Sequence, residues 1–562
     1  MGRPTKIKLK PARTGASRRD FFKRSGSAAV AITSVPMLGF GSSAVAATAN
    51  AVFQHGVASG DPLADRVILW TRASPISSRT ATVVTYTVAT DSGFGAIVAT
   101  GSTKTNVLRD FTVKVDVAGL QPNTSYYYRF SADGAVSPIG RTKTLPVGAA
   151  PQLRMAVVSC SNFAYGYFNV YQRIAERADL DMVVHLGDYI YEYGTGQYGT
   201  ARACEPANEI LTLADYRARH AQYKRDENSQ AMHRQHPMVA IWDDHETANN
   251  SWVGGAENHT PATEGDWAAR VAVALQAYYE WMPVRVVDPT TPRRNQRSYA
   301  FGNLVDLIML EERLGGRSEQ LGTNIGSASG YFTQTGAYAD PARQLLGADE
   351  EAWLFAKLRS STAKWKFLGQ GVMFAQLKVV GAPNAAGGGV FLNSDQWDGY
   401  QPARDRVYSV IKGGAGQPPV GNVVVLTGDI HSSWAADLTP DPNNPNLATG
   451  GYNPATGEGS LAVEFVGTSV SSPGVNDPSG AVANSLKPAN PHFKYINLNQ
   501  RGYMLIDADP NRCVCEWWHI DTVASLSNIE TFAVAYEVRD GSNRLAPSVQ
   551  TPSRLNPPLL AP

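Results

Sequence analysis

The chain has 562 residues, of which 43% are hydrophobic and 18% are charged, so it is long enough for more than one domain with a buried core. Its formal net charge is only +1, whereas proteins that bind nucleic acids or membrane surfaces usually carry a clear basic excess. Four cysteines are too few for a disulfide scaffold. The composition therefore favours an ordinary globular protein, with no evident nucleic-acid-binding module.

The first 46 residues have the features of an export signal. A basic segment contains the adjacent pair Arg18 and Arg19, a weakly apolar run follows at residues 25–41, and Ala44-Val45-Ala46 has the small residues of a cleavage site. Paired arginines before such a run resemble a twin-arginine signal, which predicts recognition by the twin-arginine export machinery and a periplasmic or secreted protein. A disordered basic tail is the alternative. The apolar run is too short for a membrane span, so we expect no transmembrane segment in the mature chain.

Residues 47–148 have the pattern of an all-β domain. Segments 67–71, 82–88 and 111–117 are rich in β-branched residues or alternate apolar and polar side chains, which is typical of strands. A turn at 119–124 leads into an aromatic segment, 125–130, that resembles the tyrosine-corner strand of fibronectin-type domains. We therefore predict a small fibronectin- or immunoglobulin-like β-sandwich that carries no catalytic residues.

Residues 149–562 show a different pattern, in which continuous apolar strands alternate with helical segments. Apolar runs begin at residues 155, 181, 238 and 423, and a helical segment spans 266–281. Such runs are typical of strands that are covered on both faces, which indicates an α/β domain built in layers.

Each of these four strands ends in polar residues that suit metal binding: Cys160 and Asn162, Asp188 and Tyr191, Asp244 and His245, Asp429 and His431. Ligand sites in α/β sheets lie at the carboxyl ends of strands. Taken singly, such an Asp often caps a helix, a lone His is more often structural, and a lone Cys is usually part of the core. Helix capping does not require a Cys at one strand end and Asp-x-His at another, so the combination favours a multi-metal site.

These motifs carry a family resemblance. Gly187-Asp188-x-x-Tyr191 is similar to the Asp-x-x-Tyr motif of purple acid phosphatases, and Asp244-His245-Glu246 is similar to the Asn-His-Asp/Glu motif of calcineurin-like phosphoesterases. Gly428-Asp429-Ile430-His431 resembles their Gly-His-x-His motif, with Asp in place of the first His. Together with Cys160, Gly60-Asp61-Pro62 and the segment 394–400, these features resemble the PhoD-like alkaline phosphatases. The resemblance implies a four-layer αββα metallophosphoesterase core.

The resemblance also implies a function and cofactors. The expected activity is that of an exported, metal-dependent alkaline phosphatase or phosphodiesterase, in which a metal-bound hydroxide attacks a phosphate mono- or diester. The expected cofactors are one Fe³⁺ and one or two Ca²⁺ ions. The expected iron ligands are Cys160, Asp188, Tyr191 and His431, and the expected calcium ligands are Asp188, Asp244, Asp429 and the amide oxygen of Asn162. Oxygen-rich ligand sets suit Ca²⁺, which supports this division.

His245 is the expected catalytic residue, because its place in the motif suits assistance to the leaving group. Cys160 raises the alternative of a phosphocysteine intermediate, but thiol-based phosphatases place an Arg six residues later, where this chain has Gly166. Arg313 is a candidate for phosphate binding, although a structural salt bridge is the favoured interpretation because Glu311 and Glu312 depart from the family pattern. Residues 397–400 either line the pocket or pack in the core.

Two other functions remain open from the sequence. Some relatives in this fold show phospholipase D-like activity. A binding or adhesion module with structural metals belongs to a different class, which the motif around His245 disfavours.

Overall fold

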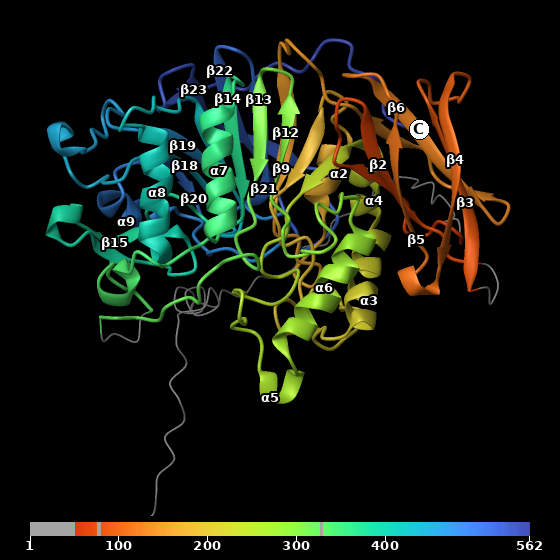
Figure 1. Ribbon diagram of the computed structural model, residues 1–562, viewed down its shortest axis with the longest axis horizontal. Helices are drawn as coiled ribbons and strands as arrows, with labels where there is room; N and C mark the ends of the chain where they lie inside the picture. Colours follow the sequence, from red (N-terminus) through yellow and green to blue (C-terminus); the bar gives the residue numbers. More distant parts are fainter. Residues whose placement is uncertain (1–50, 76–79, 326–329) are drawn as a thin grey trace, which may run out of the picture.

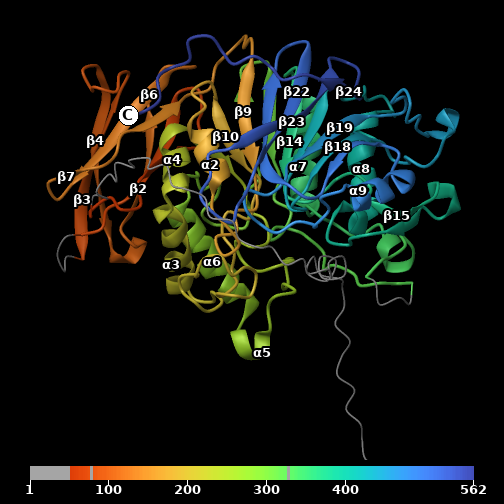
Figure 2. The same cartoon turned by 180° about the vertical axis from the view of Figure 1, so that it is seen from behind.

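The computed structural model describes residues 51–75, 80–325 and 330–562, so the predicted export signal lies outside the described residues. Two β-sheets pack face to face, and helices cover the outer face of each sheet (Figures 1 and 2). The predicted four-layer αββα core, with an all-β region before it, is therefore confirmed.

The first sheet has ten strands, and its centre is parallel. Their order is β24 (Leu545–Ser548), β23 (Glu530–Arg539), β22 (Arg512–Ile520), β21 (Arg501–Ala508), β9 (Leu153–Val158), β10 (Met182–His185), β11 (Pro237–Ala240), β1 (Val57–Gly60), β2 (Arg66–Arg72) and β5 (Thr112–Ala118). Strands β9, β10 and β11 run parallel, with Val183 opposite Ala156 on one side and Met238 on the other. Their carboxyl ends therefore meet at one edge of the sheet.

The second sheet has seven strands in the order β12 (Arg297–Phe301), β13 (Val305–Met309), β14 (Trp365–Gln370), β17 (Val423–Thr427), β19 (Ala462–Val466), β18 (Ser433–Leu438) and β20 (Phe493–Asn497). Strands β13, β14, β17 and β19 are parallel. A separate hairpin joins β15 (Lys378–Gly381) and β16 (Gly389–Phe391). Buried aliphatic and aromatic side chains such as Met155, Val184, Phe367 and Leu426 fill the space between the two large sheets.

Helices shield both outer faces. The ten-stranded sheet is covered by α2 (Asn169–Ala175), α3 (Leu213–Arg225), α4 (Glu227–Gln235) and α6 (Trp267–Trp281), with the short α5 (Pro261–Glu264) beyond α6. The seven-stranded sheet is covered by α7 (Ala348–Ser360), α8 (Gln401–Lys412) and α9 (Ala481–Leu486). Local sequence sets the helix starts: Thr212 and Asp215 form a capping box for α3, and Asp266 accepts a hydrogen bond from the N–H of Ala269 at the start of α6.

The N-terminal region is a β-sandwich that shares a sheet with the core. One layer consists of β3 (Ala81–Ala89), β4 (Ile97–Asn106), β6 (Ser125–Ala132), β7 (Ala135–Val136) and β8 (Gly140–Lys143), and the other is formed by β1, β2 and β5 of the ten-stranded sheet. The hydroxyl of Tyr126 accepts a hydrogen bond from the N–H of Gln121 at 2.8 Å, as in a tyrosine corner. Strand β1 pairs in parallel with β11, which fixes the sandwich against the core.

The motif Gly60-Asp61-Pro62 lies at the junction between the sandwich and the core. The buried Asp61 accepts hydrogen bonds from the N–H of Arg285 at 2.5 Å and from the hydroxyl of Tyr299 at 2.6 Å. The indole N–H of Trp70 donates to the carbonyl of Glu280 at the end of α6. The motif therefore joins the sandwich to the core.

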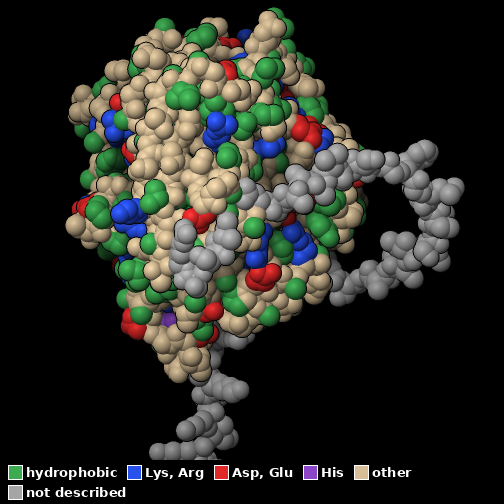
Figure 3. All heavy atoms as spheres, turned by 90° about the vertical axis from the view of Figure 1, so that its right-hand side faces the viewer, with side chains coloured by type: hydrophobic (Ala, Val, Ile, Leu, Met, Phe, Trp, Pro, Cys, Tyr) green, Lys and Arg blue, Asp and Glu red, His purple; other side chains and the backbone are tan. Residues whose placement is uncertain are grey.

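The face on the sandwich side carries interspersed acidic and basic side chains, in keeping with the near-neutral net charge (Figure 3). Among the residues that the structure describes, no helix is long and apolar enough to cross a bilayer.

Candidate functional site

The predicted site residues lie in loops at the carboxyl ends of the parallel strands of both sheets. Cys160 follows β9, Asp188 follows β10, Asp244 follows β11, and Asp429 and His431 follow β17. Each of these side chains is at most 1% exposed. Because the two sheets pack face to face, the loop after β17 meets the loops from the first sheet at one end of the core.

Three groups of these residues, all buried, have the geometry to hold metal ions. They are Cys160 with Asp188 and His431, Asp188 with Asp244 and His245, and Asp243 with Asp244 and Asp429. Within each group the ligand atoms lie within 4.8 Å of one another. Asp188 belongs to the first two groups and Asp244 to the last two, so the three groups form one continuous cluster, which we call the metal centre.

Tyr191 and His431 are positioned for coordination at the first group. The Tyr191 hydroxyl donates to Oδ2 of Asp188 at 3.0 Å and lies 3.3 Å from Nε2 of His431. Nδ1 of His431 is 2.7 Å from the carbonyl of Pro473, which places the ring proton on Nδ1 and leaves Nε2 available to a metal. Burial, with the nearby Asp188 and Cys160, raises the pKa of Tyr191, so a cation is needed to favour the phenolate.

Asn162 lies in the loop after β9, and both ends of its side chain bind the backbone. Its amide donates to the carbonyl of Tyr198 at 2.9 Å, and its oxygen accepts from the N–H of Tyr165 at 3.2 Å. Its assignment as a calcium ligand stays a prediction.

The backbone at the metal centre is held in an unfavourable conformation. Cys160, Asp188, Asp429 and His431 have φ values of 61°, 56°, 63° and 57°, in the left-handed region that costs an L-residue about 1–2 kcal/mol. Such strain gathers at functional sites, where surrounding structure must stabilise it. Gly187, with φ of 101°, allows close contact between the β10 loop and Asp243, because a Cβ atom there would collide with that residue.

His245 is oriented by a buried carboxylate. Nδ1 of His245 lies 2.6 Å from Oε2 of Glu192, and Glu192 in turn accepts from the N–H of Asn249 at 2.8 Å. Burial by itself would lower the pKa of His245, but the carboxylates of Glu192, Asp244 and Asp188 raise it to about 10. The ring is therefore a hydrogen-bond donor here, and Nε2 is the nitrogen that Glu192 does not bind.

Arg313 lies among the carboxylates of the metal centre and is completely buried. Its guanidinium donates to Asp243, to both oxygens of Asp395 at 2.9 and 3.0 Å, and to Oδ1 of Asp429 at 3.0 Å. The favoured interpretation, a structural salt bridge, agrees with this geometry. Glu311 and Glu312 accept hydrogen bonds from neighbouring backbone N–H groups, which shows why the departure from the family pattern is tolerated.

The charges at the centre fit bound cations. Asp188, Asp243, Asp244 and Asp429 are four buried carboxylates, and Arg313 and the protonated His245 supply two positive charges against them. Buried charges are costly unless they are paired or coordinate metals, so the excess negative charge fits cation binding. The donor set of thiol, phenol, imidazole and carboxylate near Cys160 differs from the purely carboxylate set near Asp429, which suits two different metals.

The backbone of the centre is organised by Glu246. Its carboxylate accepts from the N–H groups of Asp188, Tyr189 and Asp243 at 3.0, 2.5 and 2.8 Å. Burial raises the pKa of Glu246 to about 7, against the opposing effect of these hydrogen bonds.

Several residues that contact the predicted site were absent from the prediction: Asp243, Glu192, Asp395 and Ser472. Asp243 directly precedes Asp244, and Asp395 lies in a motif shared with the family, so the local sequence could have identified both. No local pattern identifies Ser472, whose hydroxyl donates to the Tyr191 hydroxyl at 2.6 Å. Residues 397–400 are buried and pack in the core; Trp397, for example, donates to Glu312.

Comparisons with known proteins give the family. The model for PhoD-like phosphatases matches residues 155–517, and the model for the N-terminal domain of PhoD-like phosphatases matches residues 40–146. Alkaline phosphatase D of Bacillus subtilis (strain 168) is 38% identical over 474 residues, which cover 82% of this chain and 76% of that protein. A structure described as that of PhoD matches with a TM-score of 0.78 and 35% identity, over 89% of this chain and 92% of that one. The resemblance seen in the sequence is confirmed: the chain belongs to the PhoD-like phosphatase family and is a phosphoric ester hydrolase of the alkaline phosphatase D type.

Proposed function

We propose that this protein is an exported, metal-dependent phosphatase and phosphodiesterase that holds one Fe³⁺ and one or two Ca²⁺ ions. The observation that supports this proposal best is the continuity of the metal centre, in which Asp188 and Asp244 each belong to two ligand groups. Cys160, Asp188, Tyr191 and His431 would hold iron. Asp188, Asp244 and Asp429, with Asn162, would hold calcium, and Asp243 lies close enough to take part.

The residues of the chain have separate tasks in this proposal. When bound, the ions would lower the pKa of a water molecule and neutralise charge on the phosphoryl oxygens. His245 donates a proton or a hydrogen bond to the leaving oxygen, because Glu192 holds the ring through Nδ1 and keeps it protonated. Arg313 keeps the carboxylates Asp243, Asp395 and Asp429 in place.

The proposed location is the periplasm or the outside of the cell. Support comes from Arg18 and Arg19 before the weakly apolar run and the Ala44-Val45-Ala46 site. Replacing both arginines with lysine should leave the protein in the cytoplasm, which cell fractionation would measure.

The substrate class can be tested with chromogenic esters. We expect the protein to hydrolyse both p-nitrophenyl phosphate and bis-p-nitrophenyl phosphate, to lose both activities with a chelator, and to regain them with calcium. Turnover of neither ester by metal-loaded protein would contradict the proposal and would favour a binding module.

The metals can be tested by elemental analysis of protein purified without chelator. We expect iron and calcium. Full activity with zinc alone would contradict the proposed ligand assignment, because the carboxylate group near Asp429 suits calcium better than zinc.

A further inference from the structure

The loop after β19 packs against the loop that carries the first predicted iron ligand. It spans residues 467–473 and begins at the carboxyl end of a parallel strand of the second sheet. The N–H of Val470 donates to the carbonyl of Ser159 at 2.9 Å, and the hydroxyl of Ser471 donates to the carbonyl of Asn162 at 2.9 Å. The loop of the second sheet is therefore fixed on the loop after β9 of the first sheet.

Residues 472 and 473 contact three of the four predicted iron ligands. The N–H of Ser472 donates to the carbonyl of Cys160 at 3.3 Å, and the hydroxyl of Ser472 lies 2.6 Å from the Tyr191 hydroxyl. The carbonyl of Pro473 lies 2.7 Å from Nδ1 of His431. Ser472 is completely buried. One short segment thus lies directly behind the predicted ligands.

In the hydrogen bond between Ser472 and Tyr191, Ser472 is the donor. The single hydroxyl proton of Tyr191 is directed to Oδ2 of Asp188 at 3.0 Å, so the Tyr191 oxygen accepts from Ser472. The Ser472 hydroxyl also lies 2.9 Å from the carbonyl of Cys160. That carbonyl already accepts from the N–H groups of Ser471 and Ser472, so the hydroxyl proton is available to Tyr191.

Ionisation of Tyr191 would strengthen this hydrogen bond. Iron binding requires the phenolate, and an O–H group donates to a charged oxygen about twice as strongly as to a neutral one. The distance of 2.6 Å lies within the range of about 2.5–2.7 Å that is typical of charge-assisted O–H bonds. The proton that Tyr191 shares with Asp188 is lost on ionisation, whereas the proton of Ser472 remains.

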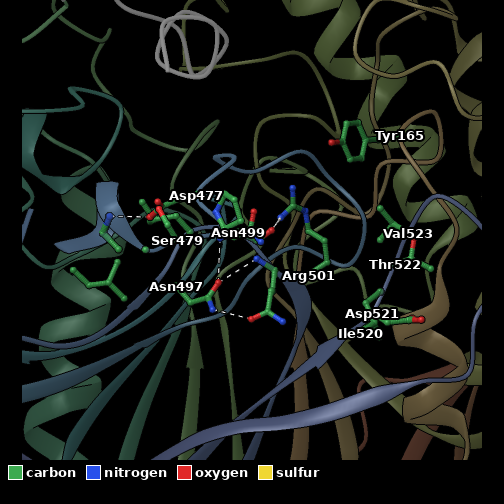
Figure 4. A pocket seen from close by; sticks show the side chains of 16 residues that line it. Tyr165, Asp477, Ser479, Asn497, Asn499, Arg501, Ile520, Asp521, Thr522 and Val523 are labelled. Atoms are coloured by element: carbon green, nitrogen blue, oxygen red, sulfur yellow. Dashed lines mark hydrogen bonds between the residues drawn. The ribbon is translucent and has the colours of Figure 1, made fainter. Parts of the chain in front are cut away.

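The backbone of Ser472 is held from the opposite side by Arg501. Nε of Arg501 donates to the carbonyl of Ser472 at 2.5 Å, and the hydroxyl of Ser469 donates to the same carbonyl at 2.7 Å. Arg501 lines a pocket of about 660 Å³ together with residues 496–500, and none of the metal-centre residues lines it (Figure 4). Because the carbonyl of Ser472 is fixed on the pocket side, its hydroxyl is held in one orientation towards the metal centre.

We propose that Ser472 is a positioning residue for the phosphatase reaction, whose hydroxyl donates to the Tyr191 phenolate and limits the charge that the phenolate gives to iron. A phenolate without this donor would offset more of the cation's charge, so less of that charge would act on the phosphoryl oxygens. The inference rests on the proposed function, in which Tyr191 binds Fe³⁺. It adds to that function a residue that acts through Tyr191 rather than on the substrate.

The visible absorption spectrum tests the proposal without turnover, because a ferric phenolate absorbs by charge transfer from the phenolate to the iron. Removing the donor raises the energy of the phenolate electrons, so the band of iron-loaded Ser472→Ala should lie at longer wavelength than that of the wild type, at equal iron content. Tyr191→Phe should abolish the band, which assigns it. For p-nitrophenyl phosphate, kcat of Ser472→Ala should fall about tenfold, with KM within about twofold.

Ser472→Thr keeps the hydroxyl and should restore both the wild-type band and kcat. Ser472→Cys takes its place if the added methyl group prevents folding, and its weaker donor should give a band at an intermediate wavelength. Ser471→Ala is the matched control, because it removes a buried hydroxyl of the same loop that donates to Asn162 instead. Its band should match that of the wild type.

An unshifted band in iron-loaded Ser472→Ala, or an unchanged kcat, would overturn the role of Ser472 and leave the proposed function intact. Equal band shifts in Ser472→Ala and Ser471→Ala would do the same. Loss of iron that neither Ser472→Thr nor Ser472→Cys reverses would also overturn it, because Ser472 would then only build the site. Iron-loaded wild-type protein without a visible band would instead overturn the assignment of Tyr191 to iron, on which the inference rests.

Discussion

Among single residues, Glu192 has the closest connection to His245. Its carboxylate binds Nδ1 of the ring and also accepts from the backbone of Asn249 and the side chain of Asn258. Because these donors fix the carboxylate, the ring has one orientation, with its second nitrogen directed away from Glu192. Carboxylates that hold a functional histidine in this way typically matter about as much as the residues they hold.

Glu192→Gln should therefore lower kcat about 10- to 100-fold while metal content stays unchanged. The neutral amide can still hold the ring but no longer keeps it protonated. His245→Ala should lower kcat further, again with its metals retained. Steady-state kinetics with p-nitrophenyl phosphate and elemental analysis measure both quantities.

The control for this variant is Glu209→Gln, because Glu209 binds Asn258 and Arg270 nearby but does not contact His245. Its kcat should stay within about twofold of the wild type. A parallel loss of metal and activity in Glu192→Gln would show instead that Glu192 supports the metal centre.

At the level of single residues, sequence analysis identified the site residues that directly follow apolar strands. Cys160, Asp188, Asp244 and Asp429 could be predicted because a strand of the core is recognisable and its carboxyl end has a known place in the fold. Ser472 comes from a loop far along the chain, and the left-handed backbone at Cys160 and Asp429 depends on contacts that no local pattern encodes.

Among the elements, β1 connects the N-terminal sandwich to the core. It pairs with β2 in the sandwich and with β11 in the core. Directly after β1, Asp61 turns the chain with φ of 43° and binds Arg285 and Tyr299 from the core. Strand β1 and the turn at Asp61 therefore join the N-terminal sandwich to the core.

Asp61→Asn should destabilise the protein by about 1–3 kcal/mol, because the charge-assisted hydrogen bonds to Arg285 and Tyr299 are weakened inside the core. Asparagine tolerates the left-handed backbone as well as aspartate does, so the variant removes the charge without adding backbone strain. Urea denaturation of metal-free protein measures the change in the free energy of unfolding. Asp65→Asn, at an exposed position in the following turn, should have no measurable effect, and an equal loss in both variants would contradict this account.

The pairing of these strands was beyond sequence analysis. Alternation in segments 67–71 and 111–117 shows which side chains are buried, but it does not name the neighbouring strand. Strands β2 and β5 extend the ten-stranded sheet through β1, and that outcome depends on the long-range contacts of Asp61 and Trp70.

At the scale of the whole molecule, the C-terminal segment holds the two regions together. Its end returns to the sandwich, where Tyr127 donates to the carbonyl of Leu559 at 2.6 Å, and Ala561 pairs with Gln235 of α4 (Figures 1 and 2). Earlier in this segment, Arg554 binds Asp181, which precedes β10. The C-terminal segment thus runs from the ten-stranded sheet to the N-terminal sandwich and contacts both.

Asp181 is the common partner in this arrangement. Its buried carboxylate accepts from Arg554 at 2.8 and 2.6 Å, from Lys143 of β8 at 2.5 Å, and from the N–H of Arg154 in β9 at 2.9 Å. Burial raises the pKa of Asp181, but Arg554 and Lys143 oppose this effect and bring the pKa below its ordinary value.

Asp181→Asn should therefore destabilise the protein by about 1–3 kcal/mol at pH 7, since it leaves the partly buried cations Lys143 and Arg554 without their charged partner. A lowered folded-state pKa means that the stabilisation is complete above the unfolded-state pKa of about 3.9 and is lost as the pH falls through the folded-state value. The difference between variant and wild type should stay constant from about pH 7 to 5 and shrink below about pH 4. Urea denaturation across this range, with chelator in every sample, measures it. The control is Asp540→Asn, which removes an exposed ion pair with Lys364 and should leave the free energy of unfolding unchanged. If Asp181→Asn lowered the free energy of unfolding by the same amount at every pH, packing rather than charge would hold the C-terminal segment in place.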